Sequence, residues 1–577
     1  MRKLGWTWSG ILYVVGCVLL AAGTPGSAAD GEFTGSQVCG TCHAGIYASY
    51  RQTDMGRSMA LPSDASQRAI VSDSGTVTSP KLNRSYSVFR KDGALYQSEY
   101  ELDSSGHEVF RDTQKLEYAM GSGVNGITYL VRRGEYLFEA PLTYYTRIHK
   151  WGLSPGYETE DLGFSRPAPA ACVSCHSGRS TADRNRRGLF GDPPFQELAI
   201  GCENCHGPGQ SHVAERRSPK AASNKAGKTI VNPAKIDGWL ADNICMNCHE
   251  GTATRVLQPG KEFSDFRPGR PLDETVAIFA PPLKPGATDV SPLLEHYTLM
   301  TLSKCFRASK GALHCVSCHD PHVQPRATAA ASYYRQKCLQ CHTAASCKLP
   351  PDARAAKQDD CAGCHMPKAG SVIPHSVLTD HRIVVTKDQP LPDEAFHRTT
   401  AALPDLVHIN AIPGKPDRIA PLTLMRAYGE LATTDPQFGR SYSAIVDELA
   451  RTNPNDYQVL SALGWREFGV GTPESYEKAM TYLSRATEAG SVAPLDYEKL
   501  ADLLRQSGRT AEAIEALKKG IGLSPYSQRL YKALALVYIG EKRYPEAMAA
   551  MEKELEVFPE DSLIRSLVVR AKAASQR

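Results

Sequence analysis

Seven copies of the motif Cys-x-x-Cys-His occupy the first two-thirds of the chain. The two thiols of such a motif can add to the vinyl groups of a porphyrin, and the adjacent imidazole can ligate its iron. The spacing therefore predicts seven covalently bound haem c groups. The cysteines are Cys39, Cys42, Cys172, Cys175, Cys202, Cys205, Cys245, Cys248, Cys315, Cys318, Cys338, Cys341, Cys361 and Cys364. The iron-ligating histidines are His43, His176, His206, His249, His319, His342 and His365.

Two other uses of paired cysteines fit this pattern less well. Zinc knuckles do not require a histidine directly after the second cysteine of every pair. Thioredoxin-like redox centres need a βαβ setting and do not occur in sevens. Covalent haem is therefore the favoured interpretation.

Length and charge limit the possible classes of function. A chain of 577 residues is expected to form more than one domain. Its formal net charge of +4, without a polybasic block, argues against nucleic acid as a partner. A ferric haem with two ionised propionates carries a charge of about −1, so the oxidised holoprotein is expected to be mildly acidic.

The N-terminus has the pattern of a secretory signal peptide over residues 1–29. Arg2 and Lys3 precede an apolar run from Ile11 to Ala22, which is too short for a comfortable membrane span. Cleavage is expected after Ala29, with no substantial membrane span thereafter; an uncleaved anchor and lipid attachment at Cys17 are the alternatives. Export to the periplasm or cell surface agrees with haem attachment, which takes place outside the bacterial inner membrane.

The motifs require a scaffold, which we predict as a mostly helical and irregular heptahaem domain over residues 30–385. Its last three motifs start only 23 residues apart, so the porphyrins must supply much of the buried apolar surface. Alternating aromatic and β-branched residues around Asp92-Gly93 and Gly134 predict a small antiparallel β insert at about 69–145.

Prolines mark a linker over residues 386–418, and residues 419–577 follow as a helical, repetitive domain. Small residues and prolines recur there with a 34-residue period, and this pattern resembles tetratricopeptide repeats. The resemblance implies an α-helical solenoid that docks a protein partner; an unrelated helical bundle is the alternative. The recurring positions are Ala501, Ala513 and Pro525, then Ala535, Ala547 and Pro559.

The second axial position of each iron decides between an electron carrier and an enzyme. Ten histidines lie outside the motifs, enough to fill all seven positions. His107, His314, His397 and His408 are expected to be ordinary residues.

Three stretches carry a resemblance to a known family. Asn204–Gly209 with His212, Cys318–His322, and Cys364–Lys368 with His381 are similar to motifs of multihaem cytochromes related to the tetrahaem cytochrome of hydroxylamine oxidation, some of them fused to tetratricopeptide repeats. The resemblance covers nearly the whole mature chain. It implies that extra histidines ligate neighbouring haems; the candidates are His212, His322, His296, His375, His381 and, more weakly, His149.

Chain geometry agrees for two of these histidines. His322 follows His319 by three residues across Pro321, so it cannot reach the opposite face of the same iron. His212 lies just past a Gly-Pro-Gly turn and has the same limit. Each must therefore serve another haem or none.

Met55 lies twelve residues after His43, where relatives often have a histidine. On a continuous helix this offset is about 18 Å, which reaches an adjacent iron but not the same one. A thioether ligand would raise that haem's potential; the alternative is that Met55 only packs.

Cys305 and Cys347 are the mature thiols outside the motifs. In an oxidising compartment we expect them to form a disulfide, with two buried thiols as the alternative.

Together these features predict an exported heptahaem electron carrier that uses its repeat domain to dock a redox or assembly partner. The alternative is a multihaem oxidoreductase that acts on a small nitrogen or sulfur species at one open haem. A redox sensor that controls the partner of the repeats is a third, less favoured interpretation.

Overall fold

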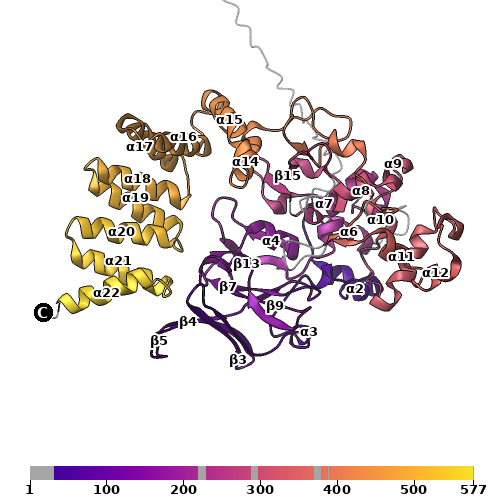
Figure 1. Cartoon of the computed structure of the whole chain (residues 1–577), viewed down its shortest axis with the longest axis horizontal. Helices are drawn as coiled ribbons and strands as arrows, with labels where there is room; N and C mark the ends of the chain where they lie inside the picture. Colours follow the sequence, from indigo (N-terminus) through magenta and orange to yellow (C-terminus); the bar gives the residue numbers. More distant parts are fainter. Residues whose placement is uncertain are drawn as a thin grey trace, which may run out of the picture.

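The computed structural model describes residues 31–218, 229–251, 253–287, 296–369, 378–386 and 389–575. Figure 1 shows a β-rich region, a region of short helices and loops, and a curved stack of helices that ends at the C-terminus. The expected signal peptide and Cys17 lie outside the described residues. Within those residues, no helix is both long and apolar enough to cross a membrane.

Two antiparallel sheets form the β-rich region. The first has the order β2 (Gly75–Ser79), β3 (Arg84–Lys91), β4 (Ala94–Leu102), β5 (Glu108–Lys115). The second has the order β1 (Met59–Ala60), β6 (Tyr118–Met120), β7 (Thr128–Arg133), β8 (Tyr136–Glu139), β11 (Arg166–Pro167). A further hairpin joins β9 (Leu142–Tyr145) and β10 (Lys150–Leu153). The predicted antiparallel structure is present and continues beyond residue 145.

The first predicted hairpin shows why these strands form. Asp92 and Gly93 have φ values of 51° and 81°, the left-handed conformation that a tight two-residue hairpin turn needs. Inward residues of β3 such as Tyr86 and Val88 are 1% and 2% exposed, while their neighbours are more accessible. The period-two pattern therefore builds one buried face.

Short helices carry most of the Cys-x-x-Cys-His motifs, and further short helices and strands connect them. The motif helices are α1 (Ser36–Gly40), α4 (Ala170–His176), α5 (Glu203–His206), α7 (Gly238–His249), α10 (Cys315–Cys318), α11 (Ala330–Cys338) and α13 (Cys361–His365). The other helices are α2 (Ala44–Tyr50), α3 (Ala65–Arg68), α6 (Gln210–Arg217), α8 (His296–Leu302), α9 (Lys304–Ser309) and α12 (Pro351–Ala355). The strand pairs are β12 (Gly178–Ala182) with β13 (Phe190–Glu197) and β16 (Lys368–Ala369) with β17 (Leu378–Thr379).

The described part of the proline-rich segment, residues 386 and 389–418, is packed rather than extended as a tether. It contains β18 (Val407–His408), which completes a three-stranded sheet with β14 (Thr254–Leu257) and β15 (Val276–Ala280). Leu403 and Leu406 are buried against Phe279 and against the first helix of the C-terminal stack. This segment therefore joins the two regions through a hydrophobic core.

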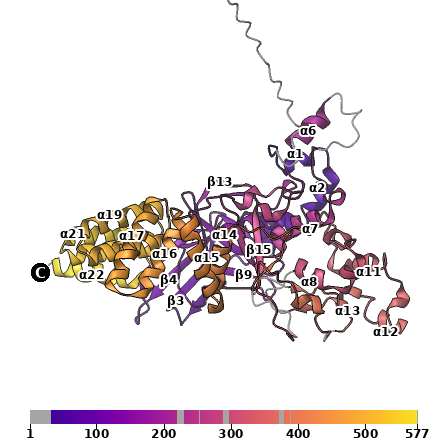
Figure 2. The ribbon, with the colours of Figure 1, turned by 90° about the horizontal axis from the view of Figure 1, so that it is seen from above.

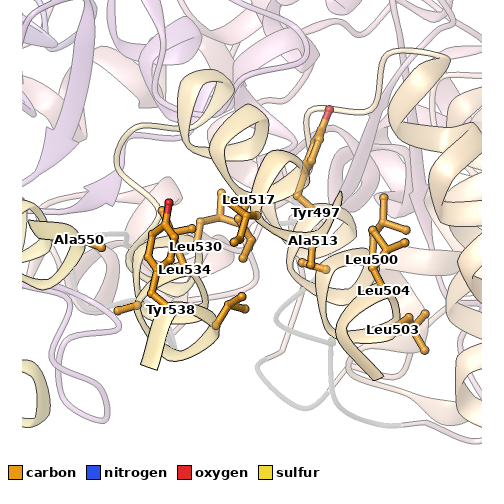
Figure 3. Close-up of a cluster of buried hydrophobic side chains, with 14 of the residues drawn as sticks. Tyr497, Leu500, Leu503, Leu504, Ala513, Leu517, Leu530, Leu534, Tyr538 and Ala550 are labelled. Carbon is orange, nitrogen blue, oxygen red and sulfur yellow. The ribbon is translucent and has the colours of Figure 1, made fainter. Parts of the chain in front are cut away.

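The C-terminal stack consists of antiparallel helix pairs, as the 34-residue period predicts. Its helices are α14 (Pro421–Ala432), α15 (Gly439–Thr452), α16 (Tyr457–Val470), α17 (Pro473–Glu488), α18 (Pro494–Gln506), α19 (Thr510–Leu523), α20 (Gln528–Gly540), α21 (Tyr544–Val557) and α22 (Ser562–Ser575). The recurring alanines 501, 513, 535 and 547 are at most 1% exposed, where their small size lets paired helices approach. Figure 3 shows Tyr497, Leu517 and Leu534 among the larger side chains between them.

Both ends of the stack contact the rest of the chain. Helix α14 packs on the β14–β15–β18 core, while Tyr526, after α19, lies with its ring 4.8 Å from that of Phe138 on β8. Nη2 of Arg84 on β3 donates to the carbonyl of Glu560, at 2.9 Å. The stack and the helices α11–α12 occupy opposite ends of the molecule (Figure 2).

Candidate functional site

The fold brings thiols of different motifs into contact. Three hydrogen-bonded pairs connect the first motif with the third, the second with the fourth, and the fourth with the fifth. The hydrogen bond within each pair and then burial raise the pKa of one thiol, namely Cys39, Cys248 or Cys315. The pairs are Cys39 with Cys202, Cys175 with Cys248, and Cys245 with Cys315.

Motif imidazoles are oriented by backbone carbonyls. His206 Nδ1 donates to the carbonyl of Val231 at 2.8 Å, and His365 Nδ1 donates to that of Val384 at 2.7 Å. A carbonyl can only accept, so Nδ1 carries the proton and Nε2 keeps its lone pair. This is the usual second contact of a metal-bound histidine.

Three extra histidines meet motif histidines that are distant in sequence. Two imidazoles on opposite sides of one metal, each with a metal–nitrogen distance of about 2 Å, have centroids about 6 Å apart. The observed centroid distances fall near this value. They are 6.0 Å for His206 and His322, 6.2 Å for His319 and His381, and 5.5 Å for His249 and His296.

His296 and His381 also lie beside each other, with ring centroids 4.6 Å apart. The backbone carbonyl of Thr379 accepts the Nδ1 proton of His381 at 2.7 Å. Nε2 of His381 therefore keeps its lone pair, as Nε2 does in His206 and His365. Burial, and then the nearby His296, lower the pKa of His381 to about 4. The imidazole is therefore neutral, as a metal ligand must be.

His212 lies on α6 in the neighbourhood of His43. Burial, then Arg216 and His43, lower its pKa, and its buried Nδ1 has no hydrogen-bond partner among the described residues. This position allows His212 to serve the first motif rather than the third motif, which precedes it directly in the sequence. The structure thus places four of the six extra histidine candidates near motif histidines.

The remaining ligand candidates are placed differently. His149 is exposed in the β9–β10 turn with a φ of 50°, and His375 lies outside the described residues. Met55 does not lie on one continuous helix with His43, because α2 ends at Tyr50. Met55 instead starts a separate 3₁₀ turn and is half-buried.

In the part of the chain that the structure describes, His176, His342 and His365 make no ring contact with an extra histidine. His176 is oriented by the carbonyl of Ser58, 3.3 Å from its Nδ1, and burial lowers its pKa.

Two of the four histidines expected to be ordinary are engaged elsewhere. His408 contacts Asp417 through Nδ1 at 3.1 Å and Asp273 through Nε2 at 3.0 Å, so both ring nitrogens are occupied. Burial lowers the pKa of His408, but the two carboxylates outweigh this effect and raise it. The second of these histidines, His314, has its Nδ1 2.9 Å from Asp242 Oδ2.

The expected disulfide between Cys305 and Cys347 is wrong, because both are free thiols in the structure. Cys305 lies near Cys341, whereas Cys347 lies near Cys361. Cys305 therefore lies beside the sixth motif and Cys347 beside the seventh.

Each motif supplies two thiols and one imidazole, the donor set that covalent haem requires. Within the described ranges, no three side chains of His, Cys, Asp or Glu converge on one point, as zinc requires. Haem needs only two thiols and an imidazole from its motif, with at most one more protein ligand. The sequence did not single out Tyr334, whose hydroxyl lies 3.3 Å from His319 Nδ1; its position four residues before Cys338 was the available signal.

Comparison with known proteins informs the C-terminal helices. A family model described as tetratricopeptide repeat matches residues 504–571. Part of the chain is similar to MamA of AMB-1, with 25% identity over 24% of this chain and 76% of that chain and a TM-score of 0.20. The first TPR of Spaghetti (RPAP3), bound to an HSP90 peptide, shares 17% identity over 21% and 97%, with a TM-score of 0.19. A thermophilic TPR protein of Thermus thermophilus shares 19% identity over 27% and 82%, with a TM-score of 0.22.

No curated protein matches the chain. The family match establishes tetratricopeptide repeats in the C-terminal region, a fold that commonly mediates protein–protein interaction.

Proposed function

We propose that this chain is an exported heptahaem c-type cytochrome that carries electrons and docks a redox or assembly partner through its repeats. The observation that carries the proposal is the set of three imidazole pairs, each of a motif histidine with a distant extra histidine, near the spacing of two ligands on one iron.

Each motif would hold one haem through its two cysteines and its histidine, and each haem would accept and release one electron. The protein's part is to orient the imidazoles through backbone carbonyls, as at His206 and His365. His322, His381, His296 and His212 would fill the second axial positions for motifs three, five, four and one. A filled position excludes small exogenous ligands and favours electron transfer over catalysis.

Thiol neighbours support an order of the motifs in space. The first motif adjoins the third, the fourth adjoins the second and the fifth, and Cys205 of the third lies near Cys245 of the fourth. Cys318 lies near Cys341, and Cys338 near Cys361, which continues the series to the sixth and seventh motifs. We propose the path one–three–four–five–six–seven, with the second haem beside the fourth.

The second candidate function is an oxidoreductase with an open iron at the second motif. It is favoured by two positions: His176 has no extra histidine in ring contact among the described residues, and His149 lies on an exposed turn. A small nitrogen or sulfur species would then bind at the position that a second histidine would fill in the first, third, fourth and fifth motifs.

Absorption and EPR spectra of the purified ferric holoprotein test the proposal. All irons are expected to be low-spin and unmoved by nitrite, hydroxylamine or cyanide. His381→Ala should convert one haem in seven to a high-spin, cyanide-binding form, whereas His107→Ala, on an exposed turn, should change nothing. Absence of covalent haem would overturn the proposal, and a ligand-sensitive high-spin haem in the unmodified protein would replace the carrier with the enzyme.

A further inference from the structure

A small polar cavity lies between the second, third and fourth motifs. It has a volume of about 30 Å³ and adjoins a wider cavity of about 470 Å³ that shares some of its lining. We call the smaller one the arginine cavity; its polar lining includes Ser174, Arg179, Ser180, Asn204, Asn247 and Ser264.

The arginine cavity faces the backs of the motif helices. Ser174, Asn204 and Asn247 each precede the second cysteine of a motif. On a helix the second cysteine and the histidine lie three and four residues after the first cysteine, so all three side chains share one face. The residue two positions after the first cysteine points away from that face. The cavity therefore lies behind the surfaces on which haem would attach.

Arg179 is held there in an unusual state. Its φ is 59°, a left-handed conformation that is unfavourable for a non-glycine residue and recurs at ligand sites. Its Cζ lies 3.3 Å from the centroid of the Phe33 ring. Its buried Nε has no hydrogen-bond partner among the described residues.

A second cation increases the positive charge beside this cavity. Arg267 Cζ lies 5.3 Å from the same Phe33 ring, so two guanidinium groups share one aromatic partner. Burial, and then repulsion from Arg267, lower the pKa of Arg179 to about 10, and Arg179 remains charged at neutral pH. Two carboxylates, Glu203 and Asp265, lie near Arg179 and partly offset this effect by raising its pKa. Glu203 lines the cavity, and its oxygens accept backbone N–H groups, including that of Gly35 at 2.7 Å.

We propose that the arginine cavity binds a small planar oxyanion, with Arg179 as its main donor and Asn247 as a neutral donor. An anion would satisfy the buried Nε and offset the repulsion between the two arginines. A volume of about 30 Å³ is that of about one water molecule, so the ion would extend into the wider cavity, which Arg179 also lines. Two sources share this chemistry: a diffusible ion such as nitrate, or the carboxylate of a haem propionate, the latter resting on the proposed function.

Calorimetric titration of the purified full chain with sodium nitrate tests the diffusible source. Saturable binding is expected, and Arg179→Gln should weaken it about tenfold or more through loss of a charged hydrogen bond. Arg179→Lys keeps the charge but loses the planar fork, so it should weaken binding less. Arg186→Gln is the matched control, because Arg186 lines the wider cavity and is already paired with Asp183 at 3.1 Å.

Redox titration of the same proteins tests the propionate source. In that case nitrate does not bind, and Arg179→Gln lowers the midpoint potential of one haem, because loss of a cation favours Fe(III). Arg267→Gln should have the same sign of effect and provides a second variant if Arg179→Gln fails to fold. The proposal is overturned if the unmodified chain binds no nitrate and neither variant moves a potential. The pyridine haemochrome assay measures the haem content separately. Absence of covalent haem would show that the proposed function fails, independently of the outcome for the arginine cavity.

Discussion

At the scale of single residues, the chemistry depends on which nitrogen of each histidine is left free. Backbone carbonyls accept the Nδ1 proton of His206, His365 and His381, so each of these rings presents Nε2 to a neighbouring group. The same rule explains why His408, with both nitrogens held by carboxylates, is unsuited to ligate a metal. Hydrogen bonding thus separates ligand candidates from structural histidines more sharply than sequence position does.

The free thiols give a prediction at this scale. If the motif cysteines carry haem, alkylation of the unfolded holoprotein without reductant should label Cys305 and Cys347 and none of the motif cysteines in the mature chain. Peptide mass spectrometry measures this directly. A Cys305–Cys347 disulfide would contradict the structure, and labelled motif cysteines would contradict thioether attachment.

At the scale of elements, the motif helices are too short to be stable alone, whereas the repeat helices support one another. Helices α4, α5, α10 and α13 have seven residues or fewer, so they depend on tertiary contacts. The C-terminal helices are longer and share a continuous apolar core from Ala479 to Val568. If the motifs carry haem, we therefore expect the repeat domain to depend on it for folding less than the motif region does.

A core truncation tests the packing of the repeats. Leu517 on α19 is fully buried between helix pairs, so Leu517→Ala should destabilise the repeat domain by about 2–5 kcal/mol through lost burial and a cavity. Leu536→Ala is the control, because Leu536 is 59% exposed, and should cost little. Denaturant unfolding followed by far-UV circular dichroism measures both; equal effects would contradict the observed packing.

At the scale of the whole molecule, the repeat stack is held at both ends. One end packs on the β14–β15–β18 core, and the other contacts the β-rich region through a buried charge network. Arg84 pairs there with Glu99 at 3.1 Å and Asp161 at 2.7 Å, while Arg565 of α22 pairs with Glu101 at 2.8 Å. This attachment restricts the orientation of the repeats relative to the motif region, so a partner bound to the middle repeats would be held at a defined position.

The contact at the C-terminal end should depend on pH. Burial, then Asp161 and Asp112, raise the pKa of Glu560 from an ordinary 4.5 to about 7. Between these values the unfolded carboxyl ionises while the folded one stays neutral, so stability is complete below pH 4.5 and declines as pH rises through 7. The contact should therefore be weaker at pH 8 than at pH 5, by up to about 3 kcal/mol.

Hydrogen exchange of α22 at the two pH values, corrected for intrinsic rates, measures this effect. Glu560→Gln keeps the backbone carbonyl that Arg84 uses and should remove much of the dependence on pH. Glu556→Gln, at an exposed side chain, should retain it. An unchanged slope in the Glu560 variant would assign the dependence to other carboxyls.

Local pattern alone determined several features of this protein. The seven motifs, the β-hairpins at Asp92-Gly93 and Gly134, and the 34-residue repeat all follow from spacings of a few residues or from a period that recurs along the chain. The buried alanines at the recurring positions confirm the repeat.

Tertiary structure decided which distant residues meet. His206 and His322, or His319 and His381, come together only after separate segments have packed, and no local pattern encodes that contact. The same holds for the free thiols Cys305 and Cys347, for the cavity at Arg179 and for the second attachment of the repeats. These features depend on how short elements, unstable alone, are arranged by their common core, and that arrangement is a property of the whole chain.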